Sequence, residues 1–274
     1  MTHTSHPVPP ELRADVAVVG GTGFYSFLDD PTHVTVETPY GAPSADLAVG
    51  EVGGRRVAFL PRHGTGHEHP PHAIPYRANA WALRSLGVRQ VIAPCAVGGL
   101  RDEVAPGDVV VPDQLVDRTF RRVGSFVERG AVHLPFADPY CARVGDAVAA
   151  ADVTVGRGGT MVVIEGPRFS TRAESLHHAA QGWTLVNMTG APEAQLAREM
   201  LMCYAAVALV TDMDAGAQSG EGVGQEEVFA LFAANTERLK GILATAIAAL
   251  PDPDGCTCAS WADGLELTYE VPGL

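Results

Sequence analysis

Two aspartates, Asp212 and Asp214, follow a run of apolar residues from 205 to 210. Such a run is typical of a buried central strand, and ligands bind at the carboxyl ends of strands in open α/β folds. Side chains two apart on a strand share a face, so both carboxylates are expected to point into one site. Beside Thr211, the pair suits an acid that holds a proton and a neighbour that accepts hydrogen bonds.

A second group of candidate residues lies where two other predicted strands end. Gly-Gly-Thr-Gly at 20–23 offers backbone N–H groups and the Thr22 hydroxyl to an oxyanion. Arg62 and His63 follow a predicted strand at 56–60, and a guanidinium matches phosphate with two parallel hydrogen bonds. The nucleotide-binding glycine motifs and their lysine are missing, so free phosphate is favoured over ATP. A bare turn and a surface Arg-His pair are the alternatives.

Histidines and cysteines raise the question of a metal. One predicted loop carries four histidines: His63, His67, His69 and His72. No cysteine or acidic motif completes a known geometry there, so a polar lid loop and no metal site are expected. Cys256 and Cys258 form a C-x-C, for which plain thiols are expected and a redox role or a strained disulfide is the alternative.

Composition excludes several classes of protein. The chain has 274 residues, 46% hydrophobic and 19% charged, which is enough for one large domain with a full core. A net charge of -13 argues against nucleic acid and anionic membranes as partners, but a locally basic pocket can still bind a small anion. The start has no signal-peptide pattern, no stretch reaches transmembrane length, and the five cysteines fit reduced thiols, so a cytoplasmic protein is expected.

Strands and helices are predicted to alternate along the chain. Residues 1–13 are predicted to be a flexible tail, 14–250 one α/β domain, and 251–274 an extension that packs on the same domain. The domain is expected to hold a twisted, largely parallel sheet flanked by helices. The predicted strands are 15–19, 56–60, 91–93, 108–111, 161–164, 185–187 and 205–212. The predicted helices are 76–86, 138–150, 172–180, 193–202 and 226–250, the third with Thr171 and Glu174 in capping-box register.

Many motifs in a fixed order resemble one family. The blocks are 20–23, 62–64, 98–101, 106–108, 117–119, 133–135, 164–175, 186–189, 192–193 and 211–214. This order is similar to that of the methylthioadenosine phosphorylases, in the trimeric branch of the purine nucleoside phosphorylases, over about residues 14 to 250. The resemblance implies the nucleoside phosphorylase fold, with a mixed central sheet in a single domain. It also implies cleavage of a purine–ribose bond by inorganic phosphate, no cofactor, and a homotrimer with the active site near the subunit interface.

The resemblance also implies roles for individual residues. Phosphate would be bound by Thr22, Arg62, His63, Cys95, Ala96 and Thr189, with Cys95 standing where the family often has a hydroxyl residue. The nucleoside would be held by Phe169, Ser170, Asn187, Met188, Thr211, Val228 and Phe229, with His67 and His133 from a neighbouring subunit. Asp212 would hold the proton for purine N7 and Asp214 would accept from the exocyclic amino group, or the reverse.

Ser170, Asp212 and Asp214 all fit adenine as the base. The 6-oxopurine members carry Asn at the position of Asp212, and mammalian-type ones carry Glu at that of Ser170. A site built on carboxylates accepts from an amino group and repels a carbonyl oxygen. The expected substrate is therefore 5′-methylthioadenosine or a related 5′-modified adenosine. Gln225, where the family often has an apolar residue, leaves a 5′-hydroxyl, 5′-deoxy or 5′-halo group open.

Other functions are weighed against this one. A phosphorylase of methylthioinosine, inosine or guanosine is the alternative within the enzymes. A nucleoside-binding protein without catalysis is disfavoured by Arg62, Thr189 and both aspartates. A dinucleotide-binding oxidoreductase lacks its glycine fingerprint.

Overall fold

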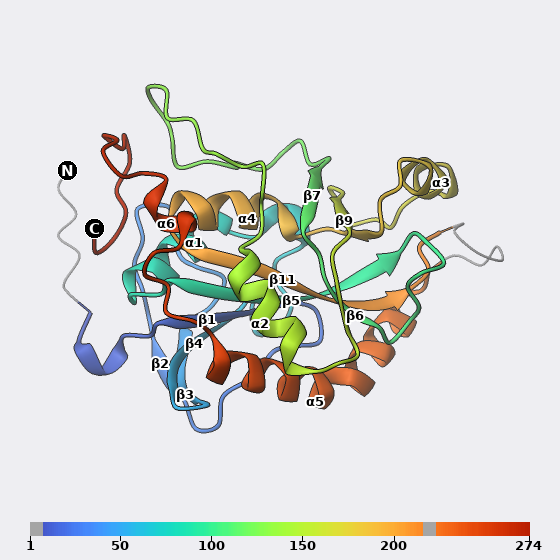
Figure 1. Cartoon of the computed structure of the whole chain (residues 1–274), viewed down its shortest axis with the longest axis horizontal. Helices are drawn as coiled ribbons and strands as arrows, with labels where there is room; N and C mark the ends of the chain where they lie inside the picture. Colours follow the sequence, from blue (N-terminus) through green and yellow to red (C-terminus); the bar gives the residue numbers. More distant parts are fainter. Residues whose placement is uncertain (1–7, 216–222) are drawn as a thin grey trace.

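The computed structural model describes residues 8–215 and 223–274, which form a twisted mixed sheet with helices on both faces (Figure 1). The strands pair in the order β2-β3-β4-β1-β5-β10-β9-β7, while β11 pairs with β5 and β6, and β6 with β8. Their bounds are β1 Val16–Gly20, β2 Thr32–Val34, β3 Leu47–Val52, β4 Arg55–Pro61, β5 Gln90–Gly99, β6 Val109–Val111, β7 Gln114–Asp117, β8 Val155–Arg157, β9 Thr160–Val163, β10 Leu185–Asn187 and β11 Cys203–Asp212. The predicted α/β fold is confirmed.

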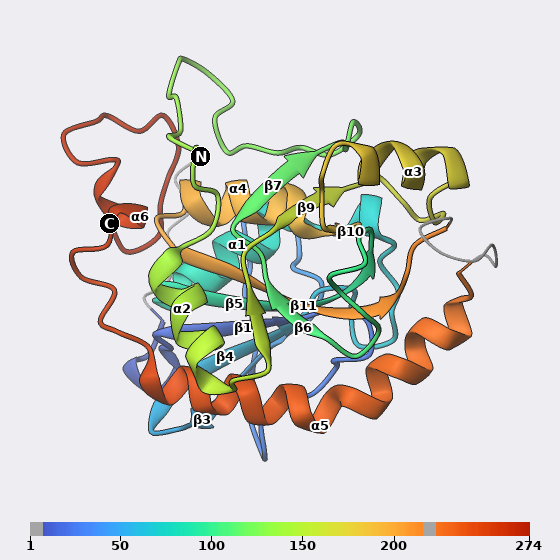
Figure 2. The same ribbon diagram turned by 45° about the vertical axis from the view of Figure 1, so that its right-hand side comes forward.

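The helices divide between the two faces of the sheet. Figures 1 and 2 show α1 and α4 on one side of the central strands and α5 along the other. The helices are α1 Tyr76–Ser85, α2 Ala142–Ala151, α3 Arg172–Ala180, α4 Gly190–Glu199, α5 Gln225–Ala249 and α6 Thr257–Ser260, with short 3₁₀ helices η1 Pro10–Leu12 and η2 Pro71–Ala73.

Strand β11 shows why its sequence is apolar without alternation. Ala206, Ala208 and Val210 belong to the core that α1 and α4 cover. Ala205, Val207 and Leu209 belong to the core that α2 and α5 cover. Because both faces of the strand are buried, every position from 205 to 210 must be apolar. The strand runs parallel to β5, so the two strands bring their carboxyl ends to the same edge.

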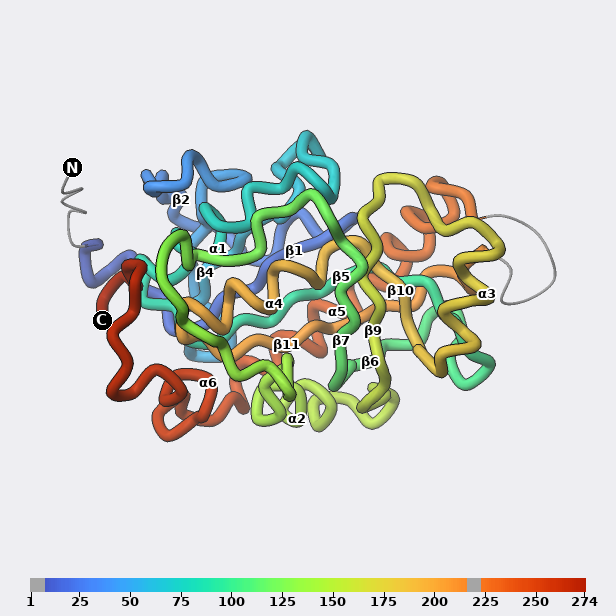
Figure 3. Tube along the Cα trace, turned by 90° about the horizontal axis from the view of Figure 1, so that it is seen from above, coloured from blue at the N-terminus to red at the C-terminus, as the bar shows by residue number. Residues whose placement is uncertain are grey.

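Helix α3 begins as its sequence predicts and lies at the edge of the molecule beyond β10 (Figure 3). Thr171 accepts a hydrogen bond from the backbone N–H of Glu174, and the Glu174 side chain accepts from that of Thr171, which completes the predicted capping box. Glu174 also pairs with Arg168 at 2.7 Å. These residues therefore fix the start of the helix.

Some elements differ from the sequence prediction. Strands β2, β3, β7 and β8 are absent from it, and three of them are only three or four residues long. Helix α4 ends at Glu199 and not at 202, because Leu201 takes a positive φ of 57°. Residues 1–7 of the predicted tail lie outside the described residues, and η1 falls in the rest of it. Among the described helices, none has the length and apolar character needed to span a bilayer.

Candidate active site

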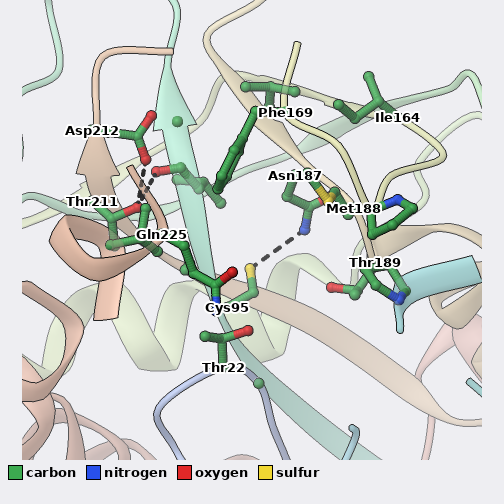
Figure 4. A pocket seen from close by; sticks show the side chains of 18 of the residues that line it. Thr22, Cys95, Ile164, Phe169, Asn187, Met188, Thr189, Thr211, Asp212 and Gln225 are labelled. Carbon is green, nitrogen blue, oxygen red and sulfur yellow. Dashed lines mark hydrogen bonds between the residues drawn. The ribbon is translucent and has the colours of Figure 1, made fainter. Parts of the chain in front are cut away.

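A cavity of about 340 Å³ opens at the carboxyl ends of β1, β4, β5, β10 and β11. Figure 4 shows Thr211, Asp212 and Gln225 on one side of it, Asn187, Met188 and Thr189 on the other, and Cys95 and Thr22 between them. Of the predicted site residues, those that line the cavity are Thr22, Arg62, His63, His67, Cys95, Ala96, Phe169, Ser170, Asn187, Met188, Thr189, Thr211, Asp212, Asp214, Val228 and Phe229. Residues far apart in the chain thus meet at one edge of the sheet.

The two aspartates share the cavity for a reason other than strand alternation. Strand β11 ends at Asp212, its register with β5 shifts between Val210 and Asp212, and Asp214 lies beyond the strand. Gly98 of β5 makes room for both: a Cβ there would lie 3.0 Å from Asp212 Oδ1 and 3.1 Å from Asp214 Cβ. The expected convergence is confirmed, but the shared strand face was the wrong reason for it.

Asp212 is built to hold a proton. Burial raises the pKa of its carboxyl from 3.8 to about 6, and the nearby Asp214 adds to the rise. The Thr211 hydroxyl lies 2.8 Å from Asp212 Oδ2 and 3.2 Å from the carbonyl oxygen of Val97. Thr211 donates to the Asp212 carboxyl and so lowers its pKa, but the effect of burial is larger. Burial is therefore the reason that Asp212 can hold a proton.

Two buried oxygens in the cavity that Asp212 lines have no partner in the described chain. Ser170 Oγ and Asp214 Oδ2 line the cavity, and neither makes a hydrogen bond. Leaving a buried polar group unpaired is costly, so these atoms indicate a ligand with polar groups. Phe169, which is 37% exposed, lies at the same end and offers an aromatic face. A flat ligand with a polar edge fits this end of the cavity.

The opposite end is rich in groups that donate to an anion. Thr189 is the N-cap of α4, but its side chain makes no capping bond, so its hydroxyl is available to the cavity. Thr22 follows β1 beside Gly21, where a Cβ would lie 2.8 Å from Arg62 Nη1 and 2.9 Å from the Pro94 carbonyl oxygen. Glycine is therefore required at position 21 for this close approach.

Arg62 is anchored in the protein more than the sequence predicts. Its guanidinium donates to Glu193 through Nε at 2.6 Å and Nη2 at 2.8 Å, to the Val19 carbonyl through Nη2, and to the Pro94 carbonyl through Nη1. Burial would lower the pKa of Arg62, but the Glu193 carboxylate more than offsets this and raises it. One Nη1 N–H has no partner among the described residues and is available for an anion.

The two histidines that line the cavity come from the loop after β4. His63 Nδ1 lies 2.8 Å from the carbonyl oxygen of His69, so Nδ1 carries the proton. Burial lowers the pKa of His63 to about 3, so the ring is neutral and its Nε2 is an acceptor. The His67 ring stacks on the His63 ring, with 4.5 Å between the ring centroids. Its Nδ1 forms a hydrogen bond with the Tyr25 hydroxyl at 2.8 Å.

Cys95 is a neutral thiol. Burial raises its pKa to about 11, and Asn187 Nδ2 donates to its sulfur at 3.6 Å. The thiol can therefore act as a weak S–H donor toward an anion. The same bond orients Asn187, whose Oδ1 accepts from the backbone N–H of Gly190 at 3.3 Å.

The two histidines expected from a neighbouring subunit have different outcomes. His133 is exposed and does not line the cavity of its own chain, and its place in a neighbour's cavity stays a prediction. His67 was assigned with it to a neighbouring subunit, but His67 lines the cavity of its own chain. Gln225 also lines the cavity, although its side chain is largely exposed.

The sequence reasoning missed several residues that build the site. Glu193 was recognised only as part of a motif, yet it holds Arg62 and accepts from the Tyr204 hydroxyl at 2.8 Å. Buried Arg122 donates to the carbonyl oxygens of Ala191 and Glu165, at 2.6 and 2.7 Å, and so holds the segments on either side of the cavity. An acidic residue directly after the predicted helix-starting Pro192 was a usable signal for Glu193. Arg122 gave none.

Comparison with known proteins supplies the family. Residues 15–248 match the model of the phosphorylase superfamily. The chain therefore belongs to the phosphorylase superfamily.

Its relatives within that family have purine nucleosides in their names. The chain is 56% identical to the S-methyl-5′-thioadenosine phosphorylase of Mycolicibacterium smegmatis, over 94% of this chain and 99% of that protein. It is also 56% identical to the purine nucleoside phosphorylase of Streptomyces coelicolor, over 96% of this chain and 99% of that protein. A solved structure of Schistosoma mansoni methylthioadenosine phosphorylase in complex with adenine superposes with a TM-score of 0.82 at 36% identity, covering 86% of this chain and 92% of that one.

Proposed function

We propose that the protein cleaves the N-glycosidic bond of 5′-methylthioadenosine, or of a closely related 5′-modified adenosine, with inorganic phosphate. The products are adenine and 5-methylthioribose 1-phosphate. The observation that carries this proposal is the polar lining of the cavity, which protonatable Asp212 shares with the unpartnered oxygens of Ser170 and Asp214. The name of the Mycolicibacterium smegmatis relative supports the same reaction, and that of the Streptomyces coelicolor relative supports phosphorolysis of a purine nucleoside.

The purine occupies the end of the cavity that holds the aspartates. Adenine presents N7 and an amino group along one edge. Asp212 donates its proton toward N7, Asp214 accepts from the amino group, and Phe169 covers the ring. Proton donation makes the base a better leaving group as the bond to C1′ breaks. A protonated carboxyl in this position supplies the acid that the reaction needs at neutral pH.

Phosphate occupies the opposite end, near Thr22 and Thr189. The free N–H of Arg62, the backbone N–H of Ala96 and the Cys95 thiol complete its donors, and His63 lies beside them. Phosphate approaches C1′ from the face opposite the base and attacks as positive charge develops on the ribose. The protein aligns the two reactants, and the reaction as proposed needs no covalent intermediate and no cofactor.

The 5′ group lies near the start of helix α5. Val228 and Phe229 offer an apolar wall, and the His67 ring meets Phe229 edge-on at 5.9 Å. Gln225, one turn earlier, adds an amide that can bond a 5′-hydroxyl. The pocket thus accepts a methylthio group and also admits a more polar substituent.

A panel of nucleosides tests the substrate directly. Methylthioadenosine, methylthioinosine, 5′-deoxyadenosine, adenosine and inosine are each incubated with the enzyme, with and without phosphate, and free base is quantified by chromatography. Phosphate-dependent release of adenine, with methylthioadenosine giving the highest kcat/KM, is expected. A preference for inosine or methylthioinosine would establish the alternative, a 6-oxopurine phosphorylase, which the name of the Streptomyces coelicolor relative also allows. Release of base without phosphate would contradict phosphorolysis.

The proposal extends to the assembly and its location. A homotrimer with the active site near the subunit interface is proposed, and the exposed apolar side chains of Phe120 and Val123 offer a surface for it. Size-exclusion chromatography with light scattering measures the mass of the assembly and tests this proposal. A fully active monomer would contradict it. A cytoplasmic location fits the five free cysteines and is tested by cell fractionation.

A further inference from the structure

Four buried cysteines meet at the end of the sheet opposite the active site. They are Cys141, Cys203, Cys256 and Cys258, and their sulfur atoms all lie within 4.8 Å of one another. Cys203 is the first residue of β11 and Asp212 is its last. An extended strand rises about 3.3 Å per residue, so the Cα atoms of these two residues are about 30 Å apart. The cluster is therefore far from the proposed catalytic carboxylates. The proposed reaction uses none of these thiols.

The four sulfurs come from three separate parts of the chain. Cys141 is the N-cap of α2 and Cys256 is the N-cap of α6, with Cys258 in the same turn. Backbone hydrogen bonds fix two of these positions. The Cys141 N–H donates to the carbonyl oxygen of Tyr204 at 2.8 Å, and the Cys203 N–H donates to the carbonyl oxygen of Arg89 at 2.8 Å. The cluster therefore joins the last segment of the chain to the start of the central strand.

The spacing of the sulfurs matches a tetrahedral metal site. Zinc–sulfur bonds of about 2.3 Å place neighbouring thiolates of a tetrahedron about 3.8 Å apart. Cys141 Sγ and Cys256 Sγ are 3.7 Å apart. A disulfide requires about 2.05 Å, and all four residues are free thiols. One ion at the centre would reach all four sulfurs with small side-chain movements, whereas the iron atoms and sulfides of an iron–sulfur cluster would force them further apart.

The surroundings can stabilise the negative charge of thiolates. Cys141 is the N-cap of α2, so its sulfur lies beside the positive end of that helix dipole. All four side chains are buried, so water does not compete for the ligand positions.

We propose that Cys141, Cys203, Cys256 and Cys258 bind one zinc ion as a structural tetrathiolate site. Binding forms four Zn–S bonds and releases the four thiol protons to solvent, which leaves a net charge of -2 on the site. No oxidation takes place. The ion holds residues 251–274 to the body of the domain, where Arg143 already donates to the Asp252 carbonyl at 2.8 Å and Arg89 pairs with Asp254 at 2.5 Å.

Metal content of the intact chain tests this site. Untagged protein is purified without chelator, and its zinc is measured by plasma mass spectrometry. About one zinc per chain is expected, released when an organomercurial blocks the thiols. Protein loaded with Co²⁺ instead should show sulfur-to-cobalt charge transfer in the near ultraviolet and the intense visible bands of tetrahedral cobalt.

Serine variants locate the ion. Cys256→Ser and Cys258→Ser should each lower zinc content at least tenfold and lower the melting temperature, while Cys95→Ser, the fifth cysteine, should keep the zinc of the wild type. If the variants do not fold, the zinc content and cobalt spectrum of the wild type still decide.

Three results would overturn the proposal. The first is a zinc-free protein with five reactive thiols, which would make the cluster a set of packed core thiols. The second is a zinc-free protein with fewer reactive thiols and a mass lower by two hydrogens for each pair, which would show disulfides. The third is zinc that remains in both variants, which would place the ion elsewhere.

Discussion

Asp212→Asn removes the proposed proton donor while keeping the shape of the side chain. With a pKa of about 6, the Asp212 carboxyl is protonated in about one molecule in eleven at pH 7. At its ordinary value of 3.8 it would be protonated in about one in 1,600, so burial raises the population of the acid roughly 140-fold. An amide can donate a hydrogen bond to N7 but cannot transfer a proton. Loss of general acid catalysis typically costs 10²–10⁴-fold, so we expect kcat for methylthioadenosine to fall by about 10²-fold or more.

The pH dependence identifies this carboxyl more sharply than the rate at one pH. Protonated Asp212 is the active form, so kcat/KM should fall as the pH rises through about 6. The ratio of wild-type to variant kcat/KM is measured from pH 5 to 8, because the titration of phosphate affects both enzymes and cancels. We expect the ratio to decline above pH 6, and activity on 6-oxopurine nucleosides relative to adenine nucleosides to rise in the variant. Exposed Asp46→Asn is the matched control and should change neither. A ratio that does not vary with pH, together with unchanged base preference, would refute the assignment of Asp212.

Three further perturbations test other parts of the structure. Glu193→Gln leaves buried Arg62 without its carboxylate, so the phosphate KM should rise at least tenfold and the free energy of unfolding should fall by about 3–5 kcal/mol; an unchanged phosphate KM would contradict the anchoring role. Gln225→Leu should raise the preference for methylthioadenosine over adenosine about tenfold, since it removes the amide that can bond a 5′-hydroxyl; equal kcat/KM ratios in the two enzymes would show that Gln225 does not contact the 5′ group. Thr171→Ala removes the α3 cap and should cost about 1 kcal/mol in denaturant unfolding, whereas a loss below about 0.3 kcal/mol would count against the capping box.

Apolar runs and turn residues were enough to predict the elements near the site. Strand β11, fully buried between two layers of helices, was predicted because every residue from 205 to 210 is apolar. Short edge strands such as β2 were missed, because exposed Thr32 and His33 carry no apolar signal and are held in the sheet by β3. Such strands form because they pair with another strand, and the local sequence pattern carries no information on that partner.

The sequence predicts site residues that directly follow an apolar strand. It does not predict partners that only tertiary contacts bring together. Ordered motifs located Asp212 and Thr189, and the structure brings both to the cavity. The partner of Arg62 was not predictable, because Glu193 lies 131 residues further along the chain. The cysteine cluster was missed for the same reason: Cys141 and Cys203 have no local motif, and only the fold brings them to the C-x-C of α6.

The Arg62–Glu193 pair has a consequence for how phosphate is held. Among the described residues that line the cavity, Arg62 is the only arginine or lysine, and the Glu193 carboxylate cancels its charge. The proposed phosphate site is therefore nearly neutral in a protein of net charge -13, and it attracts the anion through oriented N–H and O–H dipoles. Such a site exerts little long-range attraction, so phosphate affinity should respond weakly to ionic strength. The site also binds the sugar phosphate product without a strong ion pair, which favours release of the product.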